Sequence, residues 1–107
     1  MIRRLAIVGV GLLGGSVAKA ARAHGLAREI VGIGRDRARL EPALAEGALD
    51  AATTDVAAGV READFVVLAA TVRAIEALLP RVWAAAASDA VLTDVGSTKR
   101  TIVRTAE

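Results

Sequence analysis

The 107-residue chain contains no cysteine, a single histidine and only two aromatic side chains, Phe65 and Trp83. The lack of cysteine excludes disulfides, thiolate metal ligands and a thiol nucleophile. One histidine, His24, is too few for a typical zinc site, so we expect no metal site. Proteins that bind single-stranded nucleic acid stack its bases on aromatic side chains, and this chain has few to offer.

Strong charge and long apolar runs are missing as well. The net charge is only +2 at pH 7, and the basic residues form no stripe of the kind that binds nucleic acid. No apolar run reaches the roughly 18 residues of a membrane span. The start "MIRRLAIVGVGLLGGSVAKA" has the order of a signal peptide, but glycines interrupt its apolar part and a strand–turn–helix fits it better. We therefore expect a cytoplasmic protein that binds neither nucleic acid nor membranes.

What the chain does contain is a regular alternation of two patterns, with 54% hydrophobic residues, enough for the core of one domain. Apolar β-rich runs predict strands at 4–10, 29–34, 64–70 and 90–95, and 49–55 reads as a loop or a very short strand. Helical patterns cover 12–23, 36–46, 55–62, 72–87 and the residues from 97 onward. This order predicts an α/β fold, a Rossmann-type doubly wound parallel sheet with helices on both faces.

Glycines are concentrated where the first strand meets the first helix, in the pattern Gly9-x-Gly11-x-x-Gly14. In a dinucleotide site the first glycine permits a tight turn, the second lets the backbone approach the pyrophosphate, and the third lets the helix lie close to the strand. The helix start at Leu12 and Leu13 adds free N–H groups and the positive end of the helix dipole. No lysine follows, which disfavours a phosphate loop of nucleotide hydrolases. We predict a dinucleotide site, and the alternative is a turn needed only for packing.

The end of the second strand bears on the choice of cofactor. An NAD site usually has Asp or Glu there, to bind the ribose hydroxyls. This chain has Gly34 followed by Arg35, which would accept a 2′-phosphate, so NADP is favoured over NAD. Two alternatives stay open. Arg35 could be one more surface residue in an arginine-rich chain, and Asp36, which reads first as a helix cap, could turn inward and serve NAD.

Two further strand ends are expected at the same edge, where ligands of doubly wound sheets bind. After the strand at 64–70, the small residues Ala70 and Thr71 leave room for the nicotinamide ribose, although Thr71 could simply cap the next helix. After the last strand, Gly96 and Ser97 open a helix. Ser97 is either an N-cap or a hydroxyl that faces the nicotinamide and the substrate.

Four stretches, "IVGVGLLGGSVAKA", "GALDAATTD", "ADFVVLAATVRAIEALLP" and "VLTDVGSTKRTIV", together resemble the prephenate and arogenate dehydrogenases of tyrosine biosynthesis. The resemblance runs over nearly the whole chain, and its most specific pieces are the Gly-Gly-Ser end of the glycine loop and the Asp-Val-Gly-Ser-x-Lys box at 94–99. It implies an NAD(P)-linked oxidative decarboxylation of a small-molecule substrate. It also implies that Ser97 is a catalytic residue, which helps to hold the substrate hydroxyl and the catalytic base.

The chain also departs from that family. Members often have proline where Thr71 stands, and their catalytic histidine belongs to a His-Pro stretch that follows the box and is not among these 107 residues. We therefore expect 1–107 to be a truncated dinucleotide-binding domain, without the helical domain that completes the substrate site and the homodimer of the parent enzyme. The alternatives are another NAD(P)-linked reductase or 3-hydroxyacid dehydrogenase, and a non-catalytic dinucleotide sensor. The choice between prephenate and arogenate stays open.

Overall fold

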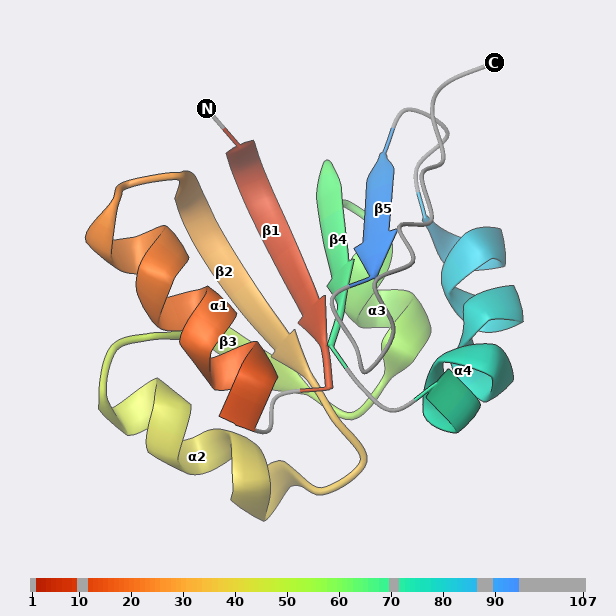
Figure 1. The fold of residues 1–107 in the computed structure, drawn as a ribbon, viewed down its shortest axis with the longest axis horizontal. Coiled ribbons are helices and arrows are strands. Elements are labelled where there is room, and N and C mark those ends of the chain that lie inside the picture. The colour runs from red at the N-terminus through yellow and green to blue at the C-terminus, as the bar shows by residue number, and fades with distance from the viewer. Residues whose placement is uncertain (1, 10–11, 70–71, 87–89, 95–107) are drawn as a thin grey trace.

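The computed structural model describes residues 2–9, 12–69, 72–86 and 90–94. Within them, five strands alternate with four helices (Figure 1). The strands are β1 (Ile2–Val8), β2 (Ala27–Ile33), β3 (Ala51–Thr53), β4 (Phe65–Leu68) and β5 (Val91–Asp94), and the helices are α1 (Leu12–Ala23), α2 (Arg37–Ala45), α3 (Val56–Val60) and α4 (Val72–Ala85). All strand pairs are parallel. The predicted fold class is confirmed, and the uncertain segment at 49–55 contains a three-residue strand.

The order of strands in the sheet is β3-β2-β1-β4-β5, with β1 in the centre. The chain builds outward from β1 to β3 on one side, then crosses over to build β4 and β5 on the other. Val8, the last residue of β1, is in register with Ile33 of β2 and Leu68 of β4, so three strands end side by side. In such sheets the crevice at the carboxyl end of the central strand, where the order reverses, is the usual place for a ligand.

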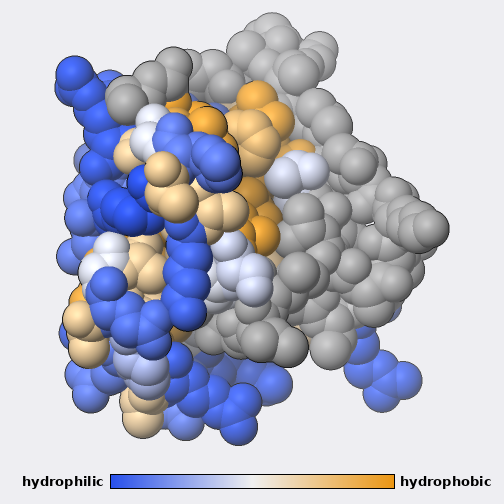
Figure 2. Space-filling view, turned by 60° about the vertical axis from the view of Figure 1, so that its left-hand side comes forward, coloured by the Kyte–Doolittle hydropathy of each residue, from blue (hydrophilic) through white to orange (hydrophobic). Residues whose placement is uncertain are grey.

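Both faces of the sheet are buried under helices, which is why the strands read as continuous apolar runs. Alternate residues of each strand point to opposite faces, and α1 and α2 cover one face while α3 and α4 cover the other. The core under α1 and α2 includes Leu5, Ile7, Ala18, Ala21, Ile30 and Val67. The core under α3 and α4 includes Ala6, Val8, Ile33, Val60, Leu68, Ile75 and Val82. Figure 2, turned so that the side of β2 and α2 comes forward, shows hydrophilic side chains interspersed with apolar ones on this surface.

The helix ends follow local sequence signals. The Asp36 carboxylate accepts a hydrogen bond from the Ala38 N–H at 3.0 Å and caps α2. Gly47 (φ +79°) follows the end of α2 in the left-handed conformation that favours glycine. The helix predicted over 55–62 is shorter than expected: it ends at Val60, because the Ala63 N–H bonds to the Val60 carbonyl and turns the chain toward β4.

Carboxylates join the strands at the amino edge of the sheet. Asp64, directly before β4, accepts hydrogen bonds from the backbone N–H groups of Arg3 (2.9 Å) and Arg4 (2.7 Å) in β1. Partial burial acts to raise the pKa of the Asp64 carboxyl, but these hydrogen bonds outweigh it, and the pKa lies below its ordinary value of 3.8. Asp64 therefore ties two central strands together as an anion.

Asp50 has the same role on the other side of β1. It lies directly before β3 and accepts hydrogen bonds from the Ile30 N–H in β2 and from the Arg22 guanidinium of α1, both at 2.7 Å. Partial burial acts to raise the pKa of the Asp50 carboxyl, but Arg22 and the Ile30 N–H together hold it below the ordinary value. Neither aspartate has a local sequence signal for this role, because their partners lie 20 to 61 residues away along the chain.

Candidate functional site

The carboxyl end of β1 turns sharply between its two neighbours. Gly9 has φ +91°, in the region that favours glycine, as a tight turn requires. Its N–H donates to the Ile33 carbonyl of β2 at 2.7 Å, and the Ala69 N–H, just after β4, donates to the Val8 carbonyl at 2.8 Å. The backbone of this turn is therefore anchored to both neighbouring strands, at the crevice of the sheet.

Helix α1 begins directly against this turn because Gly14 has no side chain. A Cβ at Gly14 would collide with the carbonyl oxygen of Gly9 and would lie 3.3 Å from Cγ2 of Ile7. A Cβ at the next residue, Gly15, would meet nothing within 4 Å. The close approach therefore depends on Gly14, which lets α1 begin against the Gly9 turn. The N-terminus of α1 thereby lies at the crevice, where the backbone N–H groups and the helix dipole would stabilise a pyrophosphate.

The turn after β2 borders the same crevice. The Gly34 N–H donates to the Thr53 carbonyl of β3 at 3.2 Å, and Asp36 is the N-cap of α2. The Arg37 guanidinium donates to the Ala52 carbonyl at 2.9 Å. Arg35 is exposed, and its side chain makes no hydrogen bond or ion pair with the rest of the described chain. Of the two arginines in this turn, Arg35 is the one whose guanidinium makes no bond to the described chain.

Position 34 is close to the core of α2. A Cβ at Gly34 would lie 3.3 Å from Cδ2 of Leu40, a side chain that is only 1% exposed. The backbone of Gly34 is outside the left-handed region, so a side chain there requires only a small shift of the Leu40 methyl group. Neither the backbone conformation at position 34 nor a close backbone contact therefore requires glycine there.

Several predicted site residues lie outside the described residues: Gly11, Ala70, Thr71, Gly96 and Ser97. Leu12 and Leu13 form the first turn of α1, at the edge of the crevice. The structure thus brings Gly9, Gly14 and the turn after β2 to one edge. His24 follows the opposite end of α1, which agrees with its exclusion from the site.

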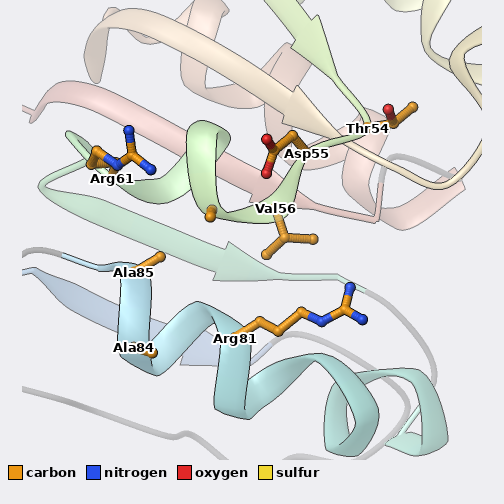
Figure 3. A pocket seen from close by; sticks show the side chains of 8 residues that line it. Thr54, Asp55, Val56, Arg61, Arg81, Ala84 and Ala85 are labelled. Atoms are coloured by element: carbon orange, nitrogen blue, oxygen red, sulfur yellow. The ribbon is translucent and has the colours of Figure 1, made fainter.

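A groove of about 720 Å³ lies elsewhere, between α3 and α4 (Figure 3). Its lining consists of Thr54, Asp55, Val56, Ala57, Arg61, Arg81, Ala84 and Ala85. In Figure 3 the Arg81 side chain extends from α4 past Val56, and the Asp55 carboxylate accepts the Ala58 N–H as the N-cap of α3. No residue predicted to bind the cofactor lines this groove, so the two features are separate.

Among the described residues, no three side chains that could ligate a metal ion lie together. No helix in this part of the chain is long and apolar enough to cross a membrane.

Comparison with known proteins gives a consistent result. The family model described as "Prephenate dehydrogenase, nucleotide-binding domain" matches residues 17–107. A cyclohexadienyl dehydrogenase of Zymomonas mobilis is 35% identical over 113 residues, which cover 98% of this chain and 36% of that protein.

Solved structures agree with this match. Prephenate dehydrogenase from A. aeolicus, determined in complex with hydroxyphenyl propionate and NAD+, superimposes with a TM-score of 0.84 at 31% identity, over 92% of this chain and 35% of that one. Arogenate dehydrogenase from Synechocystis gives a TM-score of 0.81 at 27% identity, over 90% of this chain and 34% of that one. The chain spans about a third of the length of each of these relatives.

Proposed function

The chain belongs to the prephenate dehydrogenase family, as its nucleotide-binding domain, and we propose that it is the cofactor-binding part of an enzyme that oxidatively decarboxylates prephenate or arogenate. The observation that carries the proposal is the close contact between the Gly9 turn and the start of α1. Gly9 turns the chain at the switch point, and the lack of a side chain at Gly14 lets the helix N-terminus begin against that turn. A pyrophosphate bound there would receive backbone N–H groups at the positive end of a helix.

In the proposed reaction, the ring carbon that bears the hydroxyl gives up a hydride and the hydroxyl gives up its proton. The bond between the ring and the carboxyl carbon then breaks and carbon dioxide leaves. The electron pair of that bond moves through the ring to the carbonyl oxygen formed from the hydroxyl, which takes its proton back from the base, and the ring becomes aromatic. The nicotinamide, when bound, supplies the hydride acceptor. Among the residues of this chain, we assign Ser97 to hold the substrate hydroxyl toward the base. We assign the base itself to a histidine of the parent protein outside these 107 residues, and we expect the parent to be a homodimer.

We propose further that the cofactor is NADP rather than NAD. Gly34 puts no carboxylate beside the adenosine ribose, and the Arg35 guanidinium is available for a 2′-phosphate. Asp36 uses one carboxylate oxygen, Oδ1, to cap α2 through the Ala38 N–H. The residues assigned to cofactor binding are thus Gly9, Gly11, Leu12, Leu13, Gly14, Gly34, Arg35, Asp36, Ala70, Thr71 and Gly96, with Asp36 as the residue that would serve the ribose hydroxyls if the cofactor were NAD.

Cofactor choice is tested by calorimetry with NADP+ and NAD+ on the wild type and on Gly34→Asp. The wild type should bind NADP+ more tightly, and the new carboxylate should reverse the order by repelling the 2′-phosphate. A charge-assisted contact contributes roughly 1.5–3 kcal/mol, about ten- to a hundredfold in affinity. A wild-type preference for NAD+ would show that the assignment of NADP is wrong.

Activity is tested by the absorbance of the reduced cofactor, with prephenate and arogenate in turn. The 107-residue chain should bind cofactor without turnover, because general-base catalysis alone typically contributes about 10²–10⁴-fold. In the full-length parent, Ser97→Ala should lower turnover and leave cofactor affinity unchanged. Turnover by residues 1–107 alone, or an unchanged rate in the full-length variant, would contradict these assignments.

A further inference from the structure

The turn from Gly34 to Arg37 is fixed around the tip of β3. Ala52 and Thr53 are successive residues of that strand, so their carbonyl groups point to opposite sides of it. The Thr53 carbonyl accepts the Gly34 N–H on the side of β2, while the Ala52 carbonyl accepts the Arg37 guanidinium at 2.9 Å. Among the strands that the structure describes, β3 is the last one on this side of the sheet, so the Ala52 carbonyl faces no further strand of that set.

Three contacts therefore hold the turn, and each uses a different residue. Gly34 is held through its backbone N–H, Asp36 through its bond to the Ala38 N–H, and Arg37 through its side chain. Arg35 lies between these anchored residues and has an exposed side chain. The local structure thus fixes the backbone on both sides of Arg35 while leaving its guanidinium available.

We infer that Arg37 is a positioning residue for the cofactor's 2′-phosphate: by clasping the outer carbonyl of β3, it holds the turn in the conformation from which Arg35 meets the phosphate. The inference rests on the proposed preference for NADP. Its physical basis is preorganisation, since a turn that is already ordered loses less conformational entropy when its arginine engages an anion. Arg37 is bound to Ala52 and acts on the phosphate only through Arg35.

A double-mutant cycle on the 107-residue chain tests this inference, with NADP+ and NAD+ affinities measured by calorimetry. Arg35→Ala should weaken NADP+ binding about ten- to a hundredfold and leave NAD+ binding within twofold. Arg37→Ala should weaken NADP+ binding roughly three- to tenfold, again with little change for NAD+. In the Arg35→Ala background, adding Arg37→Ala should cause no further loss, because the residue through which Arg37 acts is gone.

Arg39→Ala is the matched control, because it removes an equal charge from the same helix and the Arg39 side chain is exposed and makes no bond to β3. It should leave both affinities unchanged, and thermal melting of each variant shows that the fold is retained. An undiminished loss from Arg37→Ala in the double mutant would make Arg37 a direct phosphate ligand and overturn the inference. An equal loss for both cofactors, or no loss, would also overturn it. If Arg35→Ala leaves NADP+ binding unchanged, the proposed preference for NADP is wrong, and the inference about Arg37, which rests on it, is wrong as well.

Discussion

At the amino edge of the sheet, side-chain carboxylates join the strands, whereas at the carboxyl edge the strands are joined mainly through their backbones. Asp64 and Asp50 each accept two hydrogen bonds at the amino edge. At the carboxyl edge, the N–H groups of Gly9, Gly34 and Ala69 bond to carbonyls of neighbouring strands. The amino edge therefore uses charged side chains to stabilise the fold, whereas the carboxyl edge is held mainly by backbone hydrogen bonds.

This difference shows how one sheet separates stability from binding. Charges that are already paired cannot recognise a ligand without losing their partners. Side chains that are absent leave backbone N–H groups open to an anion. The arginines illustrate both uses: Arg22 is paired with Asp50 at 2.7 Å, whereas Arg35 at the crevice makes no such pair with the described residues. Substitutions at the two edges should therefore affect different measurements.

The largest effect is expected at the carboxyl edge, from Gly14→Ala. The added methyl group would collide with the Gly9 carbonyl, so α1 must move away from β1. We expect a loss of about 3 kcal/mol in the free energy of unfolding, at the upper end for an overpacked site, and at least a tenfold loss of dinucleotide affinity. Urea unfolding and calorimetry measure the two effects. Wild-type affinity in this variant would remove Gly14 from the cofactor site.

A smaller effect is expected at the amino edge, from Asp64→Asn. The amide cannot accept both backbone hydrogen bonds as an anion does, and we expect a loss of about 1.5 kcal/mol in stability with cofactor affinity unchanged. Glu62→Gln is the control, since that side chain is 74% exposed and its ion pair with Arg4 contributes little. Urea unfolding measures the stability of both variants. An equal loss in the free energy of unfolding for Asp64→Asn and Glu62→Gln would contradict the role of Asp64.

The two aspartates should also make stability depend on pH. Their folded-state pKa values lie below the ordinary value of 3.8, so the stabilisation is present above about pH 4 and is lost as the pH falls through the lowered values. Urea midpoints between pH 2 and 6 measure this loss. A stability that rises on acidification in this range would contradict the assignment.

The smallest effect is expected from Gly15→Ala, next to Gly14 in the sequence. Gly15→Ala places its methyl group in open space, in helical backbone without a positive φ. Alanine favours the helix over glycine, so we expect stability to rise by about 0.5–1 kcal/mol and cofactor affinity to stay unchanged. A thermal shift assay with and without NADP+ measures both. A destabilised Gly15→Ala would show that the turn tolerates no side chain at either position.

Much of the fold and part of the candidate site could be predicted, because the relevant signals are local. The cap at Asp36 and the left-handed Gly47 follow from preferences within a few residues of a helix end. The role of Gly14 follows from the short strand–turn–helix that contains it. Asp64 was assigned to the strand over 64–70, and nothing in its neighbours along the chain indicates that it holds the start of β1.

By itself, then, the sequence determined the alternation of strands and helices, the buried character of the sheet and the place of the glycine turn. These depend on hydrophobic period and on residues that are close along the chain. Only the tertiary structure decided that Asp64 meets Arg3 and Arg4, and that Arg37 clasps β3 at Ala52. Such pairs depend on strand order and register, which bring together groups 15 to 61 residues apart, and no local preference encodes that distance.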